Sequence, residues 1–449
     1  MMKYENQRNP ILPLDIHIPD SEAHVMPDGK LYVYGSFDNR EDVYCSEEYH
    51  VVSTEDMNLW EIEDEASLVG NQVSWFNNPD APKYPGIDWS NPTPFIKKMM
   101  AERSEDKEAF EVDNNKPKPA LLFAPDCIEK DGNYYFYFCM SDDSEGVAIS
   151  DSPKGKFTNM FQLPCGGIDP AIFVDDDGQA YYYWGQLFSH GVKLNEDMIS
   201  FDRDKIIDNL VTEENHYFHE GSSMRKIGDN YYYVYADMER GKPTSLGYSM
   251  SKSPLGPFEY KGIIVDNASC DPASWNNHGS IECVNGQWYV FYHRCSRNSQ
   301  LYRRLCIEKI SILPDGTIPE VKMTSQGVGE PFALGEKIMG YMACEVHGGC
   351  YIDIDEKYQE VLTNFKAESE AVFRYVKSTV DFEKIKVTAL GKGKVQVLMN
   401  GKNVGTVDIN STGDYDAFEG LIECPAGEYE LVIKAIDSKD LKIAEIILE

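Results

Sequence analysis

A polar turn followed by an aromatic-rich alternating run recurs five times along the first two thirds of the chain. Each copy begins with an Asp-Gly, Asn-Gly or Gly-Asp pair and continues with residues rich in Tyr, Phe and Val. Such pairs supply the positive φ angles of tight hairpin turns, and Tyr, Phe and Val favour strands. The five copies span residues 28–34, 131–137, 177–183, 228–235 and 285–292. The pattern therefore predicts five β-hairpins.

The spacing of these hairpins predicts a five-bladed β-propeller. Successive turn glycines from Gly132 to Gly286 are separated by 46, 50 and 58 residues, and a four-stranded propeller blade occupies about 40–50 residues. A β-sandwich is the competing all-β fold, but five copies at blade length favour the propeller. The first gap, from Gly29 to Gly132, is 103 residues. We therefore expect an inserted surface loop at 70–119, and loops of this length in a compact domain are usually functional or mobile.

The hairpin pattern stops near residue 325, and a different alternation follows. Residues 394–399 alternate polar and apolar side chains before an Asn400-Gly401 turn, and residues 429–433 repeat the alternation. Short strands at this spacing without helices are typical of a β-sandwich. We therefore expect an all-β protein, with a five-bladed β-propeller at residues 1–325 followed by a β-sandwich domain at residues 336–449.

The charge of the chain limits its partners. Its 449 residues include 75 Asp and Glu against 42 Lys and Arg, which gives a formal net charge of −33. Such a surface repels the phosphate backbone of nucleic acids and anionic membranes. No run of apolar residues approaches the roughly 18 that a transmembrane helix needs. The composition therefore excludes nucleic acid and membrane as partners, whereas neutral sugars stay compatible with it.

The N-terminus and the cysteines indicate a cellular compartment. The stretch at residues 1–15 lacks the apolar core of a secretory signal. The 11 cysteines are odd in number and contain no C-x-x-C pair, which argues against zinc clusters and against a disulfide framework. We expect a cytoplasmic protein with reduced thiols.

Four acidic residues precede the hairpins, where the innermost strand of a blade should run. Asp20, Asp169 and Glu220 each lie eight residues before the start of their hairpin copy, whereas Asp126 lies five residues before. Innermost strands surround a central channel, so acids at one offset should face a common space. Crowded carboxyls raise at least one pKa, and glycosidic hydrolysis needs one protonated and one ionised carboxyl. Alternatively, an acid before a turn simply bonds backbone amides, an explanation that is weaker for three acids at one offset.

Several short stretches carry a resemblance to one enzyme family. They are Asn9-Pro10-Ile11-Leu12-Pro13, Ala124-Pro125-Asp126, Ile168-Asp169-Pro170, Asp175-Asp176-Asp177-Gly178, His219-Glu220-Gly221, His278-Gly279-Ser280 and Tyr292-His293-Arg294. On these stretches the chain resembles glycoside hydrolase family 43 across roughly residues 9–325. The resemblance implies hydrolysis with inversion, with Asp20 as general base, Asp169 as pKa modulator and Glu220 as general acid. Members of the family are mainly β-xylosidases, α-L-arabinofuranosidases and arabinanases.

Two positions depart from the family pattern. The first-blade acid is commonly followed by Pro, whereas here Pro19 precedes Asp20. This departure leaves Asp15 as a rival for the general base. The residue before the Ala-Pro-Asp stretch is often Trp in the family and is Phe123 here, which changes the surface on which a sugar stacks.

Further residues are candidates for contacts with substrate or with a metal ion. The candidates for substrate binding are Phe123, Asp126, Trp75, Trp184 and Arg294. Buried packing is the alternative for both tryptophans, and a structural ion pair is the alternative for Arg294. In proteins similar to this one, a histidine at the position of His278 faces the propeller axis near a bound calcium or other ion, usually through water. A packed core histidine is the alternative there, and the chemistry itself requires no cofactor.

The function expected from these features is that of an inverting exo-glycoside hydrolase. It would release terminal α-L-arabinofuranosyl or β-D-xylosyl units from plant-derived oligosaccharides. An endo-arabinanase is one alternative and would need an open groove. A non-catalytic carbohydrate-binding propeller is the other, and the loss of one carboxylate would favour it. The C-terminal domain resembles family 6 carbohydrate-binding modules only diffusely, so a structural role is the simpler expectation, and the sequence leaves the oligomeric state open.

Overall fold

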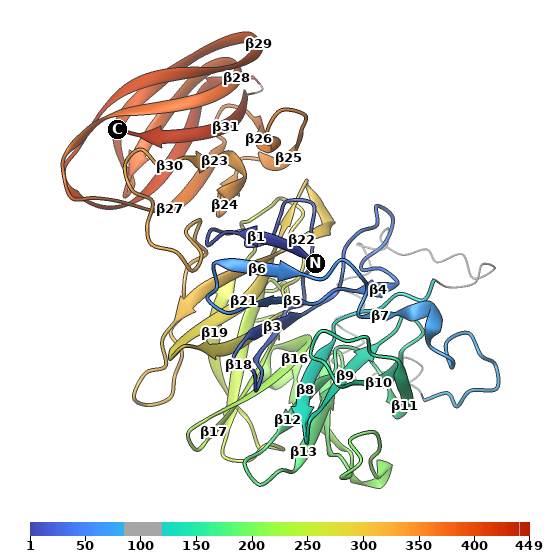
Figure 1. The fold of residues 1–449 in the computed structure, drawn as a ribbon. Coiled ribbons are helices and arrows are strands. Elements are labelled where there is room, and N and C mark those ends of the chain that lie inside the picture. The colour runs from blue at the N-terminus through green and yellow to red at the C-terminus, as the bar shows by residue number, and fades with distance from the viewer. Residues whose placement is uncertain (85–118, 440) are drawn as a thin grey trace.

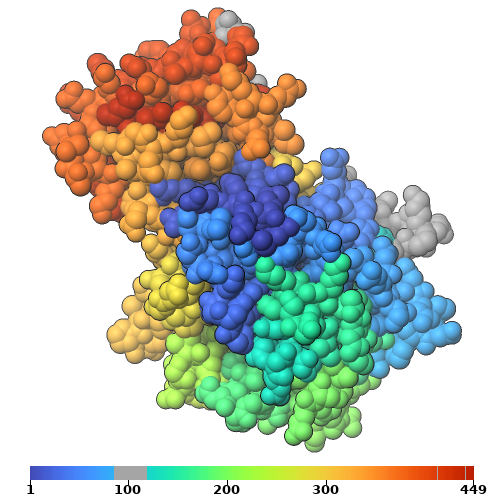
Figure 2. Space-filling model, in the orientation of Figure 1, coloured from blue at the N-terminus to red at the C-terminus, as the bar shows by residue number. Residues whose placement is uncertain are grey.

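The computed structural model describes residues 1–84, 119–439 and 441–449. Their regular structure is almost entirely β, and five sheets form a five-bladed β-propeller that is followed by a separate β-sandwich (Figure 1). The space-filling view shows the sandwich, in orange and red, seated against the propeller (Figure 2). The predicted fold class, all-β with a propeller followed by a sandwich, is confirmed.

Each blade runs outwards from the central channel. Blade 1 consists of β2 (Glu22–Val25), β3 (Leu31–Tyr34), β5 (Val52–Thr54), β6 (Leu59–Ile62) and the N-terminal β1 (Met2–Glu5). Blade 2 consists of β8 (Asp126–Lys130), β9 (Asn133–Cys139), β10 (Ser144–Ser150) and β11 (Asn159–Gly166). Blade 3 consists of β12 (Ala171–Val174), β13 (Ala180–Trp184), β14 (Phe188–Lys193) and β15 (Ile207–Thr212).

The last two blades differ in their number of strands. Blade 4 consists of β16 (Phe218–Ile227), β17 (Asn230–Asp237), β18 (Ser245–Ser251) and β19 (Glu259–Asp266). Blade 5 has β20 (Ser280–Val284), β21 (Gln287–Ser296) and β22 (Ser299–Ile310). Between blades 3 and 4 lies the short helix α2 (Glu213–His216), and a two-stranded ribbon of β4 (Glu48–Tyr49) and β7 (Leu68–Val69) lies beside blade 1.

The predicted turns join the first two strands of each blade. Their glycines, at 29, 132, 178, 228 and 286, have φ between 59° and 82°, a conformation that glycine adopts without steric cost. The aromatic strands that follow are buried because each blade packs against a neighbour on both faces. Tyrosines without exposed surface include Tyr137, Tyr182, Tyr183, Tyr232, Tyr233, Tyr235 and Tyr292.

Hydrogen bonds between the first and last blades close the ring. The amide of Ala23 donates to Ser280 Oγ at 3.0 Å, and the amide of Ile11 donates to the carbonyl of Leu305 at 3.0 Å. Contacts run from β2 to β8, β12, β16 and β20, and back to β2. Side chains on these five innermost strands therefore share one channel, although they come from distant parts of the sequence.

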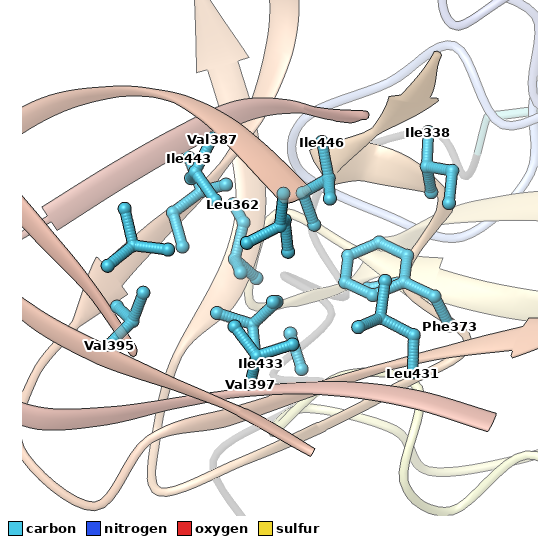
Figure 3. Close-up of a cluster of buried hydrophobic side chains, with 14 of the residues drawn as sticks. Ile338, Leu362, Phe373, Val387, Val395, Val397, Leu431, Ile433, Ile443 and Ile446 are labelled. Atoms are coloured by element: carbon cyan, nitrogen blue, oxygen red, sulfur yellow. The ribbon is translucent and has the colours of Figure 1, made fainter. Parts of the chain in front are cut away.

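The C-terminal domain is a β-sandwich around one hydrophobic core. Its strands are β23 (Ile338–Met339), β24 (Glu345–His347), β25 (Tyr351–Asp355), β26 (Gln359–Phe365), β27 (Glu370–Ser378), β28 (Phe382–Met399), β29 (Lys402–Cys424), β30 (Gly427–Ser438) and β31 (Leu441–Leu448). The long β28 pairs with β29 along its length, with β31 in its first half and with β30 in its second half. Side chains such as Phe373, Val395 and Ile446 fill the space between the layers (Figure 3).

A buried interface joins the two domains. Val372 of the sandwich packs in one cluster with Cys306 of the propeller. Glu360 of β26, which is 1% exposed, pairs with Arg304 and with Arg297, whose Nη2 lies 3.0 Å from Glu360 Oε1. Because both arginines belong to the β21–β22 hairpin, this ion pair ties the sandwich to blade 5.

Other expectations from the sequence meet the structure in different ways. All eleven cysteines lie in the described residues and are free, ten of them buried, as expected for reduced thiols. No helix of the described residues is long and apolar enough to cross a membrane. The predicted insertion at 70–119 falls mostly outside the described residues, and its described start contains the 3₁₀ helix η1 (Gly70–Gln72).

The interdomain ion pair gives a prediction for stability. Glu360→Ala leaves the buried guanidinium of Arg304 and the partly buried guanidinium of Arg297 without their shared partner. It should therefore lower the free energy of unfolding by about 3–5 kcal/mol, measured by urea denaturation. The matched control is Glu428→Ala, which removes the exposed pair with Lys377 and should cost less than about 1 kcal/mol. Equal losses in the free energy of unfolding would show that the ion pairs of Glu360 stabilise the protein no more than an exposed pair does.

Candidate active site

Three acidic side chains from different blades line one cavity. Asp20, Asp169 and Glu220 lie near the first residues of β2, β12 and β16, so they meet at one end of the central channel. The cavity has a volume of about 320 Å³. Its other lining residues include Tyr44, Phe123, Gln186, His219, Trp275 and Arg303. This cavity is the common space that the equal offset of the three acids predicts.

A larger groove of about 1080 Å³ runs along the outer part of blade 4, where Tyr232 and Lys261 line it. None of the three acids reaches this groove. Converging acids with perturbed pKa values mark functional sites better than volume does. We therefore assign the candidate active site to the smaller cavity.

The backbone is irregular at each of the three acids. Asp20 and Asp169 have φ angles of 55° and 56°, in the left-handed region that Asp tolerates better than most residues. Glu220 lies where the pairing of β16 with β17 shifts register, and the next residue, Gly221, has φ of 81°. Strained positions and bulges turn a side chain away from its regular direction, and they cluster at functional sites. Here they direct the acids into the cavity.

Asp20 is held as a carboxylate by a buried cation. Arg303 Nη1 donates to Asp20 Oδ1 at 2.8 Å, and Ser36 Oγ donates to Asp20 Oδ2 at 2.7 Å. Burial alone would raise the pKa of Asp20, but Arg303, His278 and His293 offset it and hold this pKa below its usual value. Asp20 is therefore ionised at neutral pH and can accept a proton.

Asp169 has the opposite electrostatic environment. It is 6% exposed, and the charges closest to it include other carboxylates. Burial raises the pKa of Asp169 well above its usual value, and Glu220 and Asp20 raise it further. Two acids at one site thus differ in charge state, which is the condition for acid–base chemistry on a glycosidic bond.

Glu220 is contacted by polar groups on one of its oxygens. Gln186 Nε2 donates to Glu220 Oε2 at 2.8 Å, and His219 Nε2 lies 3.9 Å from the same oxygen. On the other side of the imidazole, His219 Nδ1 lies 3.2 Å from Glu213 Oε1. Both Glu213 and His219 are buried.

His278 lies between two of the acids. Its Nδ1 is 3.7 Å from Asp169 Oδ2 and 4.0 Å from Asp20 Oδ1. Calcium prefers about six to eight oxygen ligands, so an imidazole nitrogen fits it poorly, and the calcium ion near His278 stays a prediction.

A group with the geometry of metal ligands lies further along the channel. Among the described residues it consists of Glu22, His24 and Asp126. These side chains already bind within the protein, because His24 Nε2 contacts Asp126 Oδ1 at 2.7 Å and Glu22 pairs with Arg225 at 3.2 Å. The group thus serves as an internal network of the channel.

The structure places Asp126 away from the cavity, and its substrate role stays a prediction. Asp126 has no exposed surface and does not line the cavity. Besides His24, it accepts hydrogen bonds from the amides of Cys127 and Ile172 at 2.6 and 2.8 Å. The shorter offset of Asp126 in the sequence places it deeper in the channel than Asp20.

Both predicted tryptophans and Arg294 also lie away from the cavity. Trp75 stacks on Phe138 with ring centroids 6.0 Å apart, and Trp184, 2% exposed, packs in the core between blades 2 and 3. Arg294 pairs with Glu308 at 3.0 Å. Packing contacts and a structural ion pair therefore occupy these three residues, and their contact with substrate stays a prediction.

The position of Asp15 removes it as a rival for the general base. Asp15 is exposed on the loop before β2 and does not line the cavity. Phe123, in contrast, does line it, as predicted from its place before the Ala-Pro-Asp stretch.

The structure adds residues that the sequence did not single out. Arg303, on β22, contacts Asp20, and its partner lies in another blade, so no local pattern marks it. Trp275 lines the cavity and is partly exposed. A Trp in a polar loop three residues before His278 was a usable signal for an aromatic sugar platform.

Comparison with known proteins places the chain among carbohydrate-active enzymes. The family model for glycosyl hydrolases family 43 matches residues 99–318. A xylosidase/arabinosidase of Thermoclostridium stercorarium is 27% identical over 494 residues, which covers 94% of each chain. Xylosidase/arabinosidase 43A of Humicola insolens is 28% identical over 364 residues, or 68% of this chain and 96% of that relative.

Solved structures show the same architecture. A GH43 β-xylosidase/α-arabinofuranosidase from a compost metagenome, in complex with xylotriose, has a TM-score of 0.54 and 25% identity, and it covers 72% of this chain and 99% of that chain. An arabinoxylan arabinofuranohydrolase of Bacillus subtilis has a TM-score of 0.50 and 20% identity over 98% of this chain and 97% of that chain. The second likeness shows that the similarity of fold extends through the C-terminal domain.

The opposite charge states of two acids predict opposite effects on stability. The raised pKa of Asp169 costs stability as the pH rises above about 4, the usual pKa of Asp. Asp169→Asn should therefore raise the melting temperature, and the gain should grow from pH 4.5 to pH 8. Asn also tolerates the left-handed backbone at this position.

The control for this experiment is the equivalent change in blade 1. The lowered pKa of Asp20 contributes stability above about pH 4 that is lost as the pH falls. Asp20→Asn should therefore lower the melting temperature at neutral pH, and the loss should shrink towards acid pH. Differential scanning fluorimetry across this range measures both variants, and shifts of the same sign would refute the assigned charge states.

Proposed function

Because the chain belongs to glycosyl hydrolases family 43 and is a glycoside hydrolase, we propose that it is an inverting exo-enzyme. Its substrates are plant-derived oligosaccharides that end in α-L-arabinofuranosyl or β-D-xylosyl units. The observation that carries the proposal is the convergence of Asp20, Asp169 and Glu220 on one cavity. Inverting glycosidases place one carboxyl on each side of the sugar, with room for a water molecule.

Asp20 acts as the general base. Its carboxylate accepts a proton from water while the water oxygen forms a bond to the anomeric carbon. Arg303 and Ser36 hold one oxygen of Asp20 each, which fixes the direction from which the water attacks. Asp20 is charged at neutral pH because Arg303 and two histidines oppose the effect of burial on its pKa.

Glu220 acts as the general acid, and Asp169 supports it. When the glycosidic bond breaks, the leaving oxygen takes the proton from Glu220. Burial raises the pKa of Asp169, and the neighbouring Glu220 raises it further, so Asp169 is the carboxyl beside the acid that stays uncharged. Asp169 thus supports Glu220 in its role as the acid and forms no covalent bond during the reaction.

The cavity and the relatives together favour a terminal pentose as the substrate. A volume of about 320 Å³ is at the small end of ligand sites, which span roughly 300–1,000 Å³, and it suits one end of an oligosaccharide better than a long polymer. Phe123 and Trp275 supply aromatic surface for the sugar. Relatives across most of the chain are named xylosidase/arabinosidase, and both activities act on pentosides.

The stereochemical outcome tests the proposal directly. The protein should hydrolyse 4-nitrophenyl β-D-xyloside or α-L-arabinofuranoside and should shorten xylo- or arabino-oligosaccharides from one end. Proton NMR of the first product should show the inverted anomer, since water attacks opposite to the leaving group. An initial product with retained configuration would refute the inverting mechanism, and no turnover of any pentoside would favour a sugar-binding propeller.

The division of labour between two acids can be tested with the leaving group. Glu220→Ala should lose about 10²–10⁴-fold in kcat/KM on xylo-oligosaccharides, the usual worth of general acid catalysis. On a dinitrophenyl pentoside, whose phenolate leaves without a proton, the same variant should lose far less. Asp20→Ala should lose heavily on both substrates, because every aglycone needs the activated water. If both variants respond alike to the leaving group, the two roles are assigned wrongly.

A further inference from the structure

A buried histidine–carboxylate pair stands directly behind the proposed general acid. We propose that His219, oriented by Glu213, is a positioning residue that holds Glu220 in its protonated form. This inference rests on the proposed role of Glu220. The pair matters because an inverting enzyme must start every cycle with a proton on this carboxyl.

Backbone hydrogen bonds fix the pair in place. The amide of Leu187 donates to the carbonyl of His219, and the amide of Glu213 donates to the carbonyl of Leu187 at 2.8 Å. The turn between β13 and β14, the start of α2 and the start of β16 are therefore joined in one unit. Gln186, next to Leu187, extends from the same turn and donates to Glu220 Oε2 at 2.8 Å. The unit thus gathers Gln186 and His219 around one oxygen of the acid.

The contact with Glu213 decides which nitrogen of His219 carries the proton. A carboxylate only accepts hydrogen bonds, so Nδ1, 3.2 Å from Glu213 Oε1, is the nitrogen that carries hydrogen. In the neutral imidazole, Nε2 then has a lone pair and no hydrogen. This lone pair faces Glu220 Oε2 at 3.9 Å, a separation that hydrogen bonds at catalytic sites often shorten once substrate is bound.

A lone pair at this position favours one protonation state of Glu220. A protonated carboxyl can donate to Nε2, whereas a carboxylate would face it without a hydrogen between them. The hydrogen bond from Gln186 can persist in either state. The arrangement therefore stabilises the protonated form of Glu220, and in the reaction the same proton leaves its hydrogen bond to Nε2 and moves to the leaving oxygen. If His219 were charged instead, it would favour the carboxylate, so the two possibilities predict effects of opposite sign.

Other charged groups around Glu220 come from every neighbouring blade. His219 is buried beside Glu213 and Glu220, with side chains at most 15% exposed. The remaining titratable and charged groups near the acid are Asp169, Asp20, His278, Tyr44 and Arg303. They contribute to the pH profile in every variant, so the test below compares variants that leave all of them in place.

The experiment compares two substitutions of His219 across a pH range. Asn places its amide near the position of Nδ1 and removes Nε2, whereas the longer Gln can bring its carbonyl oxygen to the position of Nε2. His219→Asn should move the basic limb of the kcat/KM profile on xylo-oligosaccharides to lower pH by about one unit. Activity at pH 8 would then fall about tenfold, with a smaller loss at pH 5 and little change in KM. His219→Gln should restore most of the profile.

Two controls separate this role from a structural one. His190→Gln removes a similar pair, in which His190 Nδ1 lies 2.6 Å from Asp208 Oδ1 on the outer strands of blade 3, and it should leave the profile unchanged. A dinitrophenyl pentoside needs no acid, so on it His219→Asn should lose much less than on oligosaccharides. Melting temperatures of all variants show whether each one folds.

Each outcome decides the inference. If the basic limb of the kcat/KM profile of His219→Asn stays in place or moves to higher pH, the inference is overturned. An equal loss of kcat/KM on xylo-oligosaccharides and on the dinitrophenyl pentoside also overturns it. If His219→Asn fails to fold, His219→Gln carries the test, and a shifted limb in that folded variant would overturn the acceptor role. Failure of the proposed function is distinguishable, because it appears in Glu220→Ala as a loss independent of the leaving group.

Discussion

The guanidinium of Arg303 is the contact on which the active site depends. It is 2% exposed, it donates to Asp20 at 2.8 Å, and it makes two further hydrogen bonds to Asp38 at 2.9 and 3.0 Å. Burying carboxylates is costly unless a cation or hydrogen-bond donors compensate them. Without Arg303, the like charges at this end of the channel would repel one another and the blades that carry them. With it, Asp20 keeps its charge while Asp169 tends to stay neutral.

The propeller makes such a site from ordinary strands. Closing the ring brings five innermost strands into contact, so one residue per blade is enough to build a cluster. The remaining requirement is local, since each acid must turn into the cavity and away from the sheet. The left-handed backbone of Asp20 and Asp169 and the register shift at Glu220 meet this requirement. Closure of the propeller ring therefore brings the three acids together, and the local irregularity of the backbone directs their side chains into the cavity.

The parts of this arrangement that repeat along the chain could be predicted from the sequence. The turn glycines predicted the blades, and the offset of eight residues brought Asp20, Asp169 and Glu220 together. The same offset, applied strictly, would have excluded Asp126, which lies three residues further along its blade and deeper in the channel. Trp75 and Trp184 show why aromatic residues are harder to assign, because packing between blades uses the same residue types as sugar stacking.

The sequence did not predict the contacts of Arg303 and His219, for a different physical reason. Their roles come from pairs that join separate segments, Arg303 with Asp20 of blade 1 and His219 with Glu213 of α2. A repeat shows where each strand lies but does not show which side chains of different blades will face each other. Only the closed ring supplies that information, so residues that tune the acids are harder to predict than the acids.

The β21–β22 hairpin connects this site to the second domain. Consecutive residues of a strand point to opposite faces, and β22 uses this alternation at two adjacent arginines. Arg303 turns to Asp20 and the cavity, whereas Arg304 turns to Glu360 of the sandwich. Arg297, in the turn of the same hairpin, binds Glu360 as well. The sandwich therefore binds the same strand, at the adjacent residue, that supplies the cation beside Asp20.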